Sequence, residues 1–258
     1  MRNHVTGARW WVCGALTVLA LSASSGCKVE GAAAGTAHQE SQQQKYQHAV
    51  SRVTIDLDSG DITLHTGSGG QVSVQRSLKW DSTKPTVTEG WTGDTLAITA
   101  RCASGEHSCA ADYQVDLPAD VTVVAKTNAG NVTTRGIHGG QELRSDAGDL
   151  TVKDSGGALT LHTNNGRVTG TGLAAAQVDA GTDAGDVNLT LTTVPDSLTA
   201  KSSAGDIDLL VPKTDGGYAV QAGTNAGAKR VLVDTSGSSK RRIVATTDSG
   251  DVQVRYAP

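Results

Sequence analysis

The chain has 258 residues, of which 31 are Gly and none is Phe, and its formal net charge is −4. This mildly acidic balance argues against a nucleic-acid-binding protein, because that class usually carries a basic excess. The scarcity of Glu, Lys and Leu relative to Gly, Thr, Val and Asp excludes a coiled coil. The length permits one or two domains.

Residues 1–26 have the order of segments that is typical of a secretory signal peptide. Arg2 and Arg9 precede an apolar run at residues 10–21, and small polar residues follow it. Twelve helical residues span about 18 Å, which is too short for a hydrocarbon core of about 30 Å. We therefore predict a cleaved signal peptide rather than a retained membrane-spanning anchor.

The end of this segment, Ser24-Ser25-Gly26-Cys27, resembles a bacterial lipobox, in which the Cys receives lipid and becomes the mature N-terminus. Gly26 fits this pattern, whereas Ser24 departs from it because Leu is most common there. An ordinary cut after Ser25 is the alternative. We expect Cys27 to be lipidated, which would hold the protein at the extracytoplasmic face of the cell membrane.

Residues 27–47 follow as a small, polar, Gln-rich stretch without periodicity, and they predict a flexible tether. A short amphipathic helix is the alternative for this stretch. The remainder, residues 48–258, is predicted to be a single β-repeat domain.

Cysteine usage agrees with export. Cys102 and Cys109 flank a polar loop that contains Gly, and an oxidising compartment favours a disulfide that closes a hairpin there. Cys27 is then left without a partner, which lipidation explains. The alternative, half of a metal site, lacks a neighbouring CxxC or HxxxH spacing. We predict no metal and no cofactor.

The β-repeat domain is indicated by apolar residues that alternate with polar ones, as at Val53, Ile55 and Leu57. No helical pattern of ten residues occurs after Tyr46. A short unit then recurs, made of a small residue, Gly, a turn residue and two apolar positions. Its predicted corner pairs are Gly60 and Asp61, Gly130 and Asn131, Gly148 and Asp149, Gly166 and Arg167, Gly185 and Asp186, Gly205 and Asp206, and Gly250 and Asp251. A degenerate copy ends at Gly227.

Each unit predicts two short strands joined by a tight corner, and such units bury an apolar face only when they stack. The sequence therefore predicts an all-β fold, a β-solenoid or β-helix-like rod, with an irregular N-terminal sheet over residues 48–125. A β-sandwich is the alternative for that N-terminal part. The copy at residues 250–256 is expected to end the rod, capped by the chain's last three residues.

The corner residues have a structural interpretation. Gly supplies the positive φ of a sharp turn, and the following Asp or Asn is expected to bond the backbone two residues ahead. Arg167 is expected to offset the charge of Asp149 in the neighbouring unit. A calcium ladder is the weaker alternative, because calcium-binding β-rolls repeat every nine residues.

The opening VTIDLDSGDITL, the segment YQVDLPADVTVVAKTNAGNV and the serial AGD(V/I/L) copies resemble the putative adhesin family, a bacterial domain-of-unknown-function group found in envelope proteins and lipoproteins. The resemblance covers roughly residues 48–258. It implies a surface-exposed, β-solenoid-like domain, and it brings no established activity, cofactor or functional residue.

Candidate ligand contacts are few. The only basic concentration, Lys240, Arg241 and Arg242 near Lys229-Arg230, is either a solvated loop or a contact for an acidic wall polymer. Trp80 and Trp91 flank a TKPTVTEG loop, where they could stack on sugar rings or cover a strand edge. No GxSxG elbow is present, and we predict no catalytic residues.

These features predict a non-enzymatic envelope lipoprotein whose β-repeat binds an unknown ligand, such as a cell-wall glycan or a surface protein. The first alternative is a glycan-acting β-helical enzyme. The second is a sensory or regulatory envelope module that acts through a protein partner. The sequence does not indicate an oligomeric state.

Overall fold

The computed structural model describes residues 37–67, 71–106 and 108–258. The chain divides into two compact units, Met1–Gly35 and Thr36–Pro258, and the fold below is that of the second unit. The predicted signal peptide and Cys27 lie outside the described residues.

The described residues form 21 strands in two sheets and contain no helix, so the all-β repeat prediction is confirmed. None of them belongs to a helix that is long and apolar enough to span a membrane. The eleven-stranded sheet has the spatial order β1 (His38–Tyr46), β4 (Val72–Trp80), β7 (Cys109–Leu117), β3 (Ile62–Thr66), β9 (Val132–Arg135), β11 (Leu150–Lys153), β13 (Val168–Leu173), β15 (Val187–Leu191), β17 (Ile207–Val211), β21 (Val252–Tyr256) and β19 (Lys229–Leu232). The ten-stranded sheet has the order β18 (Ala219–Ala226), β20 (Arg242–Ser249), β16 (Ser197–Ala204), β14 (Gln177–Ala184), β12 (Leu159–Asn165), β10 (Gln141–Ala147), β8 (Thr122–Ala129), β2 (Arg52–Ser59), β6 (Thr95–Arg101) and β5 (Thr86–Thr92).

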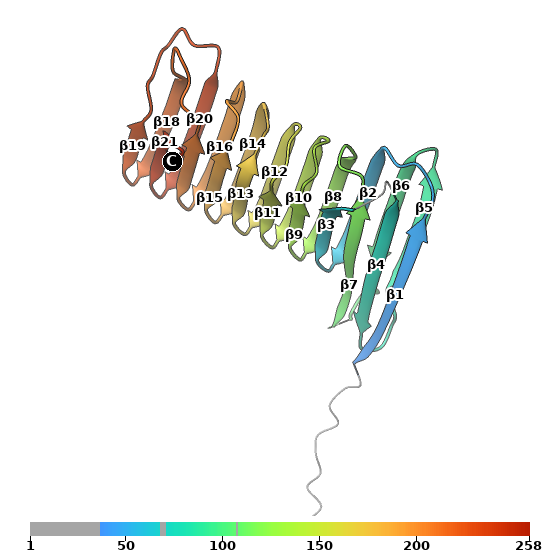
Figure 1. The fold of residues 1–258 in the computed structure, drawn as a ribbon. Helices are drawn as coiled ribbons and strands as arrows, with labels where there is room; N and C mark the ends of the chain where they lie inside the picture. The colour runs from blue at the N-terminus through green and yellow to red at the C-terminus, as the bar shows by residue number, and fades with distance from the viewer. Residues whose placement is uncertain (1–36, 68–70, 107) are drawn as a thin grey trace, which may run out of the picture. The chain divides into compact units, whose positions relative to one another are not determined.

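The two sheets are built from stacked rungs, each a strand of the ten-stranded sheet, a Gly corner and a strand of the eleven-stranded sheet (Figure 1). Neighbouring rungs pair in parallel and in register, so that Leu143 in β10 lies beside Leu161 in β12. Because strand side chains alternate between faces, these aliphatic residues all point between the sheets. They form one continuous core, in which Leu143 and Leu161 are fully buried.

The N-terminal end of the stack is irregular, as predicted. β4 pairs antiparallel with both β1 and β7, and β5 pairs antiparallel with β6. β1 occupies residues 38–46, which the sequence had assigned to a flexible tether or a short helix. The sequence of β1 shows no alternation of apolar and polar residues, because this strand pairs with the edge of β4 through its backbone and buries no apolar face.

The other end of the stack corrects the predicted order of rungs. β20 and β21 lie between the preceding rung, β16 and β17, and the rung formed by β18 and β19. The copy at Gly250 is therefore internal, and the degenerate copy at Gly227 ends the stack. Lys229 and Arg230 lie on the terminal strand β19, where charged side chains disfavour edge-to-edge pairing.

The corner glycines stack directly on one another. A Cβ built on Gly205 would lie within 3.0 Å of the carbonyl group of Gly185, and the φ of Gly205 is 151°. Five more corners meet the Gly of the preceding rung in the same way, Gly130, Gly148, Gly166, Gly185 and Gly250, and so does the terminal Gly227. No side chain fits in this column without shifting the backbone.

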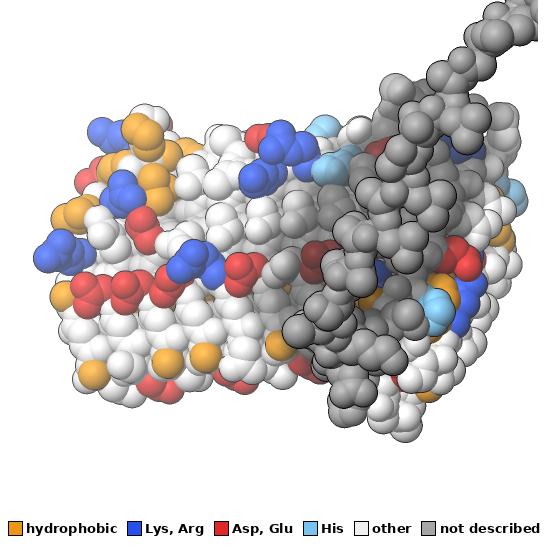
Figure 2. Space-filling model, turned by 90° about the horizontal axis from the view of Figure 1, so that it is seen from below, with side chains coloured by type: hydrophobic (Ala, Val, Ile, Leu, Met, Phe, Trp, Pro, Cys, Tyr) orange, Lys and Arg blue, Asp and Glu red, His pale blue; other side chains and the backbone are white. Residues whose placement is uncertain are grey.

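The residue after each corner Gly bonds across rungs, not to the backbone two residues ahead. The N–H of Asp251 donates to Asp206 Oδ1 at 2.7 Å, and the N–H of Ala228 donates to Asp251 Oδ1 at 2.8 Å. Ala228 itself needs no side-chain acceptor, because no rung follows it. Figure 2 shows acidic side chains in a row along the stack, with a basic side chain set into the row.

Arg167 is the exception within this row. Its backbone N–H donates to Asp149 Oδ1 at 2.7 Å, whereas its guanidinium lies 3.0 Å from Asp186 Oδ2. The expectation that the Arg167 side chain offsets Asp149 is therefore wrong. The long side chain reaches forward to the next rung, where Asp186 provides an acceptor at the surface.

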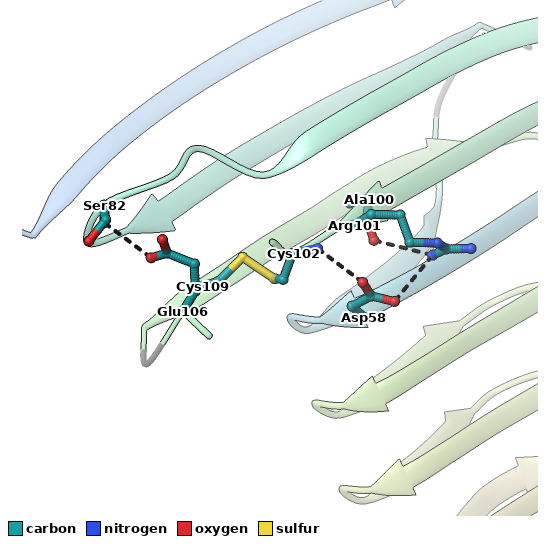
Figure 3. Close-up of a disulfide and its surroundings, with 7 residues drawn as sticks. All are labelled: Asp58, Ser82, Ala100, Arg101, Cys102, Glu106 and Cys109. Carbon is teal, nitrogen blue, oxygen red and sulfur yellow. Dashed lines mark hydrogen bonds and ion pairs between the residues drawn. A yellow bond between two sulfur atoms is a disulfide. The ribbon is translucent and has the colours of Figure 1, made fainter. Parts of the chain in front are cut away.

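The predicted disulfide between Cys102 and Cys109 is confirmed, with a Cα–Cα separation of 6.0 Å. It does not close a hairpin. Cys102 follows the end of β6 and Cys109 begins β7, and these two strands belong to different sheets. The N–H of Cys102 donates to Asp58 Oδ2 at 3.0 Å, and Arg101 pairs with the same carboxylate (Figure 3). The disulfide therefore fastens the crossing between the two sheets near the irregular end.

Replacing both cysteines, Cys102→Ser with Cys109→Ser, is expected to lower the free energy of unfolding by about 2.5 kcal/mol, since the closed loop is short and the bond restricts mainly the unfolded chain. Urea unfolding followed by circular dichroism measures this change. The unsubstituted protein in excess reductant provides the control and should unfold at the same urea concentration as the double variant. A loss below about 1 kcal/mol would contradict the constraint on the unfolded chain.

Candidate functional site

A column of basic side chains crosses the outer face of the ten-stranded sheet. In-register pairing places one outward position of each strand in a line, and five successive strands contribute Lys126 from β8, Arg144 from β10, His162 from β12, Gly181 from β14 and Lys201 from β16. Lys126, Arg144 and Lys201 are exposed. The sequence spaces these residues 18 to 20 positions apart, so no local motif indicated the column.

A second column lies beside it, at the ends of the same strands next to the corners. Asp146, Asn164, Asp183, Ser203 and Asp248 each precede a position that is paired in register with the neighbouring strand. Asn164 Nδ2 donates to Asp146 Oδ1 at 3.4 Å. The face therefore carries cations in one line and hydrogen-bonding carboxylate, amide and hydroxyl groups in the next.

A pocket of about 490 Å³ opens between these two columns. Arg144, His162 and Lys201 line it from the basic column, and Asp183 and Asp248 line it from the second column. The residues that line it come from the neighbouring strands β10, β12, β14, β16 and β20. A cation face with neighbouring oxygen acceptors suits a ligand that carries both an anionic group and hydroxyls.

Gly181 creates this hollow. A Cβ at position 181 would lie 2.9 Å from Nδ1 of His162, so the imidazole leans over the rung that has no side chain. His162 Nε2 in turn lies 3.6 Å from Asp179 Oδ2. The backbone of Gly181 is outside the positive-φ region, so the turn chemistry that requires Gly at the corners does not apply here.

The charges in the pocket differ in how they are satisfied. Arg144 Nε pairs with Glu142 Oε1 at 3.0 Å on the same strand. Lys201 takes part in no ion pair with any residue of the described ranges, although Asp183 and Asp248 line the same pocket. The Lys201 ammonium is therefore available to an incoming anion without breaking an internal pair.

The outer face of the eleven-stranded sheet carries a row of hydroxyls. Thr63, Thr133, Thr151 and Thr169 lie side by side on β3, β9, β11 and β13. Further along, Asp208 pairs with Arg255 at 2.7 Å.

The basic residues that the sequence singled out do not form the pocket. Lys240 and Arg241 precede β20, Arg242 begins that strand, and Lys229 and Arg230 lie in β19 rather than in a loop. Arg241 Nη1 donates to the carbonyl of Asp215 at 3.2 Å. Lys229 and Arg230 thus lie on the terminal rung, Lys240 and Arg241 on the loop that returns the chain to β20, and Arg242 one rung inside the end of the stack.

Trp80 and Trp91 lie in strands and partly cover the core at the irregular end. Trp80 ends β4 and stacks on His38 of β1 with ring centroids 5.5 Å apart. Trp91 lies in β5, a strand that begins within the stretch predicted to be a loop, and it packs against Tyr46 and His48. Their arrangement matches the strand-edge cover, the second of the two interpretations of the sequence.

A half-buried polar cluster joins the two sheets at this end. Glu89 of β5 pairs with Arg76 of β4 at 2.8 Å and accepts hydrogen bonds from the hydroxyls of Tyr46 and Tyr113, each at 3.1 Å. Burial, together with the Glu89 charge, raises the pKa of Tyr46 to about 12 and also raises the pKa of Tyr113. Both hydroxyls therefore stay protonated and donate to the carboxylate at neutral pH. This cluster links the antiparallel strands β1, β4 and β5 at the irregular end, here called the cap, and it leaves no open site.

Sequence reasoning missed a set of buried or half-buried hydroxyls that bond to the corners. In seven rungs the residue three positions before the corner Gly is Ser or Thr, and its hydroxyl donates to the corner carbonyl of the preceding rung. The donors are Thr127, Ser145, Thr163, Thr182, Ser202, Thr247 and Thr224, at 2.8 to 3.0 Å. The signal was available as a recurring Ser or Thr in the repeat.

Within the described ranges, no three His, Cys, Asp or Glu side chains are grouped so that they could share a metal ion. The corner acids are each engaged by a backbone N–H of the next rung, as at Asp206 and Asp251. These carboxylate oxygens thus stabilise the contact between neighbouring rungs.

Two facing sheets of stacked strands, closed on one side by Gly corners, define an all-β repeat protein. The chain belongs to the Toastrack DUF4097 family, whose sequence pattern matches residues 94–256, more than half of the chain. The resemblance to an adhesin-like domain-of-unknown-function group is thereby confirmed. Among curated proteins, no sequence matches this one.

Solved structures include similar chains at low sequence identity. A "putative adhesin" from Bacteroides fragilis is 12% identical over 84% of this chain and 97% of its own, with a TM-score of 0.48. A "putative adhesin" from Parabacteroides distasonis is 13% identical over 85% of this chain and 98% of its own, with a TM-score of 0.47. A "putative cell adhesion protein" from Clostridium sporogenes is 10% identical over 85% of this chain and 100% of its own, with a TM-score of 0.40.

Proposed function

We propose that this chain is a non-enzymatic, lipid-anchored module of the cell envelope that binds a ligand through the outer faces of its stacked sheets. The observation that supports it best is the in-register outer face of the ten-stranded sheet, which presents a basic column and the pocket lined by Arg144, His162 and Lys201. The family membership supports an adhesin-like role. The lipid anchor rests on the sequence around Cys27 alone.

Glycan hydrolysis is the second candidate, because two acids line the same pocket. Asp183 and Asp248 lie on β14 and β20, with β16 between them, so the strands that carry them are about 10 Å apart. Inverting glycosidases use two carboxyl groups about 6.5–9.5 Å apart. Both side chains are exposed, however, whereas a general acid usually needs burial to hold its proton at neutral pH. Binding is therefore the better-supported function.

One experiment separates these candidates. The protein purified from its producing cells is incubated with isolated cell envelopes and with purified wall glycans, and both retained protein and released reducing ends are quantified. Retention without release is expected. Release that disappears in Asp183→Asn or Asp248→Asn would instead establish the enzyme, and retention on protein components alone would favour a module that acts through a protein partner.

The anchor has a test of its own. Cys27→Ser is expected to move the protein from the membrane fraction to the soluble exported fraction, because it removes the thiol that would carry the lipid. Ser25→Ala keeps Cys27 and serves as the control. An unchanged membrane fraction in Cys27→Ser would contradict lipid anchoring.

A further inference from the structure

We infer that the pocket around Gly181 binds an oligosaccharide that carries carboxylate groups, an inference that rests on the proposed binding function and assigns its ligand. The pocket volume of about 490 Å³ falls within the range of about 300–1,000 Å³ that is common for ligand sites. Its lining reaches from β10 to β20, which at about 4.8 Å per strand is about 19 Å. A cleft of this length accommodates several sugar rings rather than a single small ion.

The anionic part of the ligand is assigned from the basic column. Arg144 and Lys201 lie on either side of His162 and Gly181 in the line of outward positions. A guanidinium binds a carboxylate through two parallel hydrogen bonds, and an ammonium adds a point charge. Lys201 has no competing ion pair within the described residues, which leaves its charge for the ligand.

The hydroxyl-bearing part is assigned from the second column. Asp183, Ser203 and Asp248 line the pocket opposite the cations, and none of them forms an ion pair with Lys201. Carboxylate oxygens accept hydrogen bonds from sugar hydroxyls, and a Ser hydroxyl both donates and accepts. A poly(glycerol phosphate) unit offers only about one free hydroxyl for each charge, whereas a uronic acid ring within a chain offers about two for the acceptors Asp183 and Asp248. The mixed lining thus fits an acidic sugar better than a poly(glycerol phosphate).

The glycine itself argues for a built pocket rather than a chance gap. Gly is unfavourable in the interior of a strand, and Gly181 does not have a positive φ that would require a glycine there. Any side chain at this position would collide with His162 and fill the hollow between Arg144 and Lys201. The glycine is therefore needed for the hollow on the outer face and not for the backbone conformation of the rung.

Isothermal titration calorimetry with trigalacturonate as the probe tests the inference on the protein purified from its producing cells. The fully methyl-esterified trimer removes the charge and keeps the ring hydroxyls, and poly(glycerol phosphate) supplies anions of the other kind. Lys201→Gln removes the free cation, and Gly181→Ala fills the hollow. Lys240→Gln removes one positive charge from the basic cluster that the sequence singled out, outside the pocket, and is the matched control.

Lys201→Gln is expected to weaken trigalacturonate binding at least about tenfold, the usual effect of losing a charge-assisted hydrogen bond. Gly181→Ala should weaken it by a similar factor, because the new methyl group occupies the hollow and displaces His162. Lys240→Gln should bind like the unsubstituted protein. The methyl ester should bind at least about tenfold more weakly than the free acid. Lys201→Gln changes an exposed side chain, so it tests the site even if Gly181→Ala does not fold.

Three results would overturn the inference. One is the absence of trigalacturonate binding by a protein that is retained on cell envelopes, which would leave the proposed binding function intact. Another is equal binding by Lys201→Gln, Gly181→Ala and the unsubstituted protein. The third is tighter binding of poly(glycerol phosphate) than of trigalacturonate. Conversely, trigalacturonate binding without retention on envelopes would support the site and count against the envelope role.

Discussion

Gly205→Ala is expected to lower the free energy of unfolding by at least about 3 kcal/mol, because the substitution combines a backbone clash with an unfavourable φ. The new Cβ would lie within 3.0 Å of the Gly185 carbonyl, and that carbonyl belongs to a backbone that pairs on both sides. The φ of 151° at Gly205 is one that L side chains rarely adopt. Urea unfolding followed by far-ultraviolet circular dichroism measures the loss.

Gly223→Ala is the matched control. Gly223 lies within β18 of the ten-stranded sheet, whereas Gly205 follows the end of β16; a Cβ at Gly223 meets no heavy atom within 4 Å, and its φ is not in the positive region. We expect its stability to change by no more than about 0.5 kcal/mol. Similar losses in Gly205→Ala and Gly223→Ala would contradict the view that the corner column, rather than strand glycine in general, holds the stack.

Glu89→Ala is expected to lower the free energy of unfolding by about 3 kcal/mol or more, because it leaves the partner of a half-buried ion pair without its counter-charge. Arg76 and Glu89 side chains are only 17% and 12% exposed. The same substitution removes the acceptor of the Tyr46 and Tyr113 hydroxyls. The cap that joins the two sheets would lose its main polar connection.

Two further variants separate charge from hydrogen bonding in this cluster. Glu89→Gln keeps a side-chain oxygen that can accept a hydrogen bond, so it should fall between Glu89→Ala and the unsubstituted protein. Glu142→Gln removes the same charge from an exposed pair with Arg144 and should change stability little. Thermal unfolding at pH 7 ranks the variants. A loss in Glu142→Gln as large as that in Glu89→Ala would show that burial is not the cause.

The repeated corner was predictable because its cause is local. Alternation of apolar residues reports which side of a strand faces the core, and Gly before Asp or Asn reports a sharp turn. Leu150, Val168 and Val187 follow successive corners and are all fully buried. The disulfide was predictable as well, since Cys102 and Cys109 lie seven positions apart on either side of a polar loop.

The rung order was not predictable from chain order, although a signal for it was present. The rung that ends at Gly250 inserts between the rungs of Gly205 and Gly227, through the loop that precedes β20. Loop lengths permit either order, and only the fit of the strands decides between them. Ala228, which replaces the usual corner acid, marks the rung that has no successor.

The candidate site shows the same division. Arg144, His162 and Lys201 belong to three different repeats, and each taken alone is an ordinary polar residue on a strand. Parallel pairing in register brings them into one column, and Gly181 opens the pocket only because its neighbours on both sides carry long side chains. The basic cluster that is visible in the sequence, Lys240 to Arg242, lies outside this pocket.

The repeat strands, the corners, the disulfide pairing and the family resemblance were therefore predictable, since each follows from residues close together along the chain. The neighbours of each rung, the strand at residues 38–46 that covers β4, the reach of Arg167 to Asp186 and the convergence of cations on one face became visible only in the folded chain. These features depend on register between strands about 20 to 45 residues apart, which backbone pairing sets and local composition does not encode.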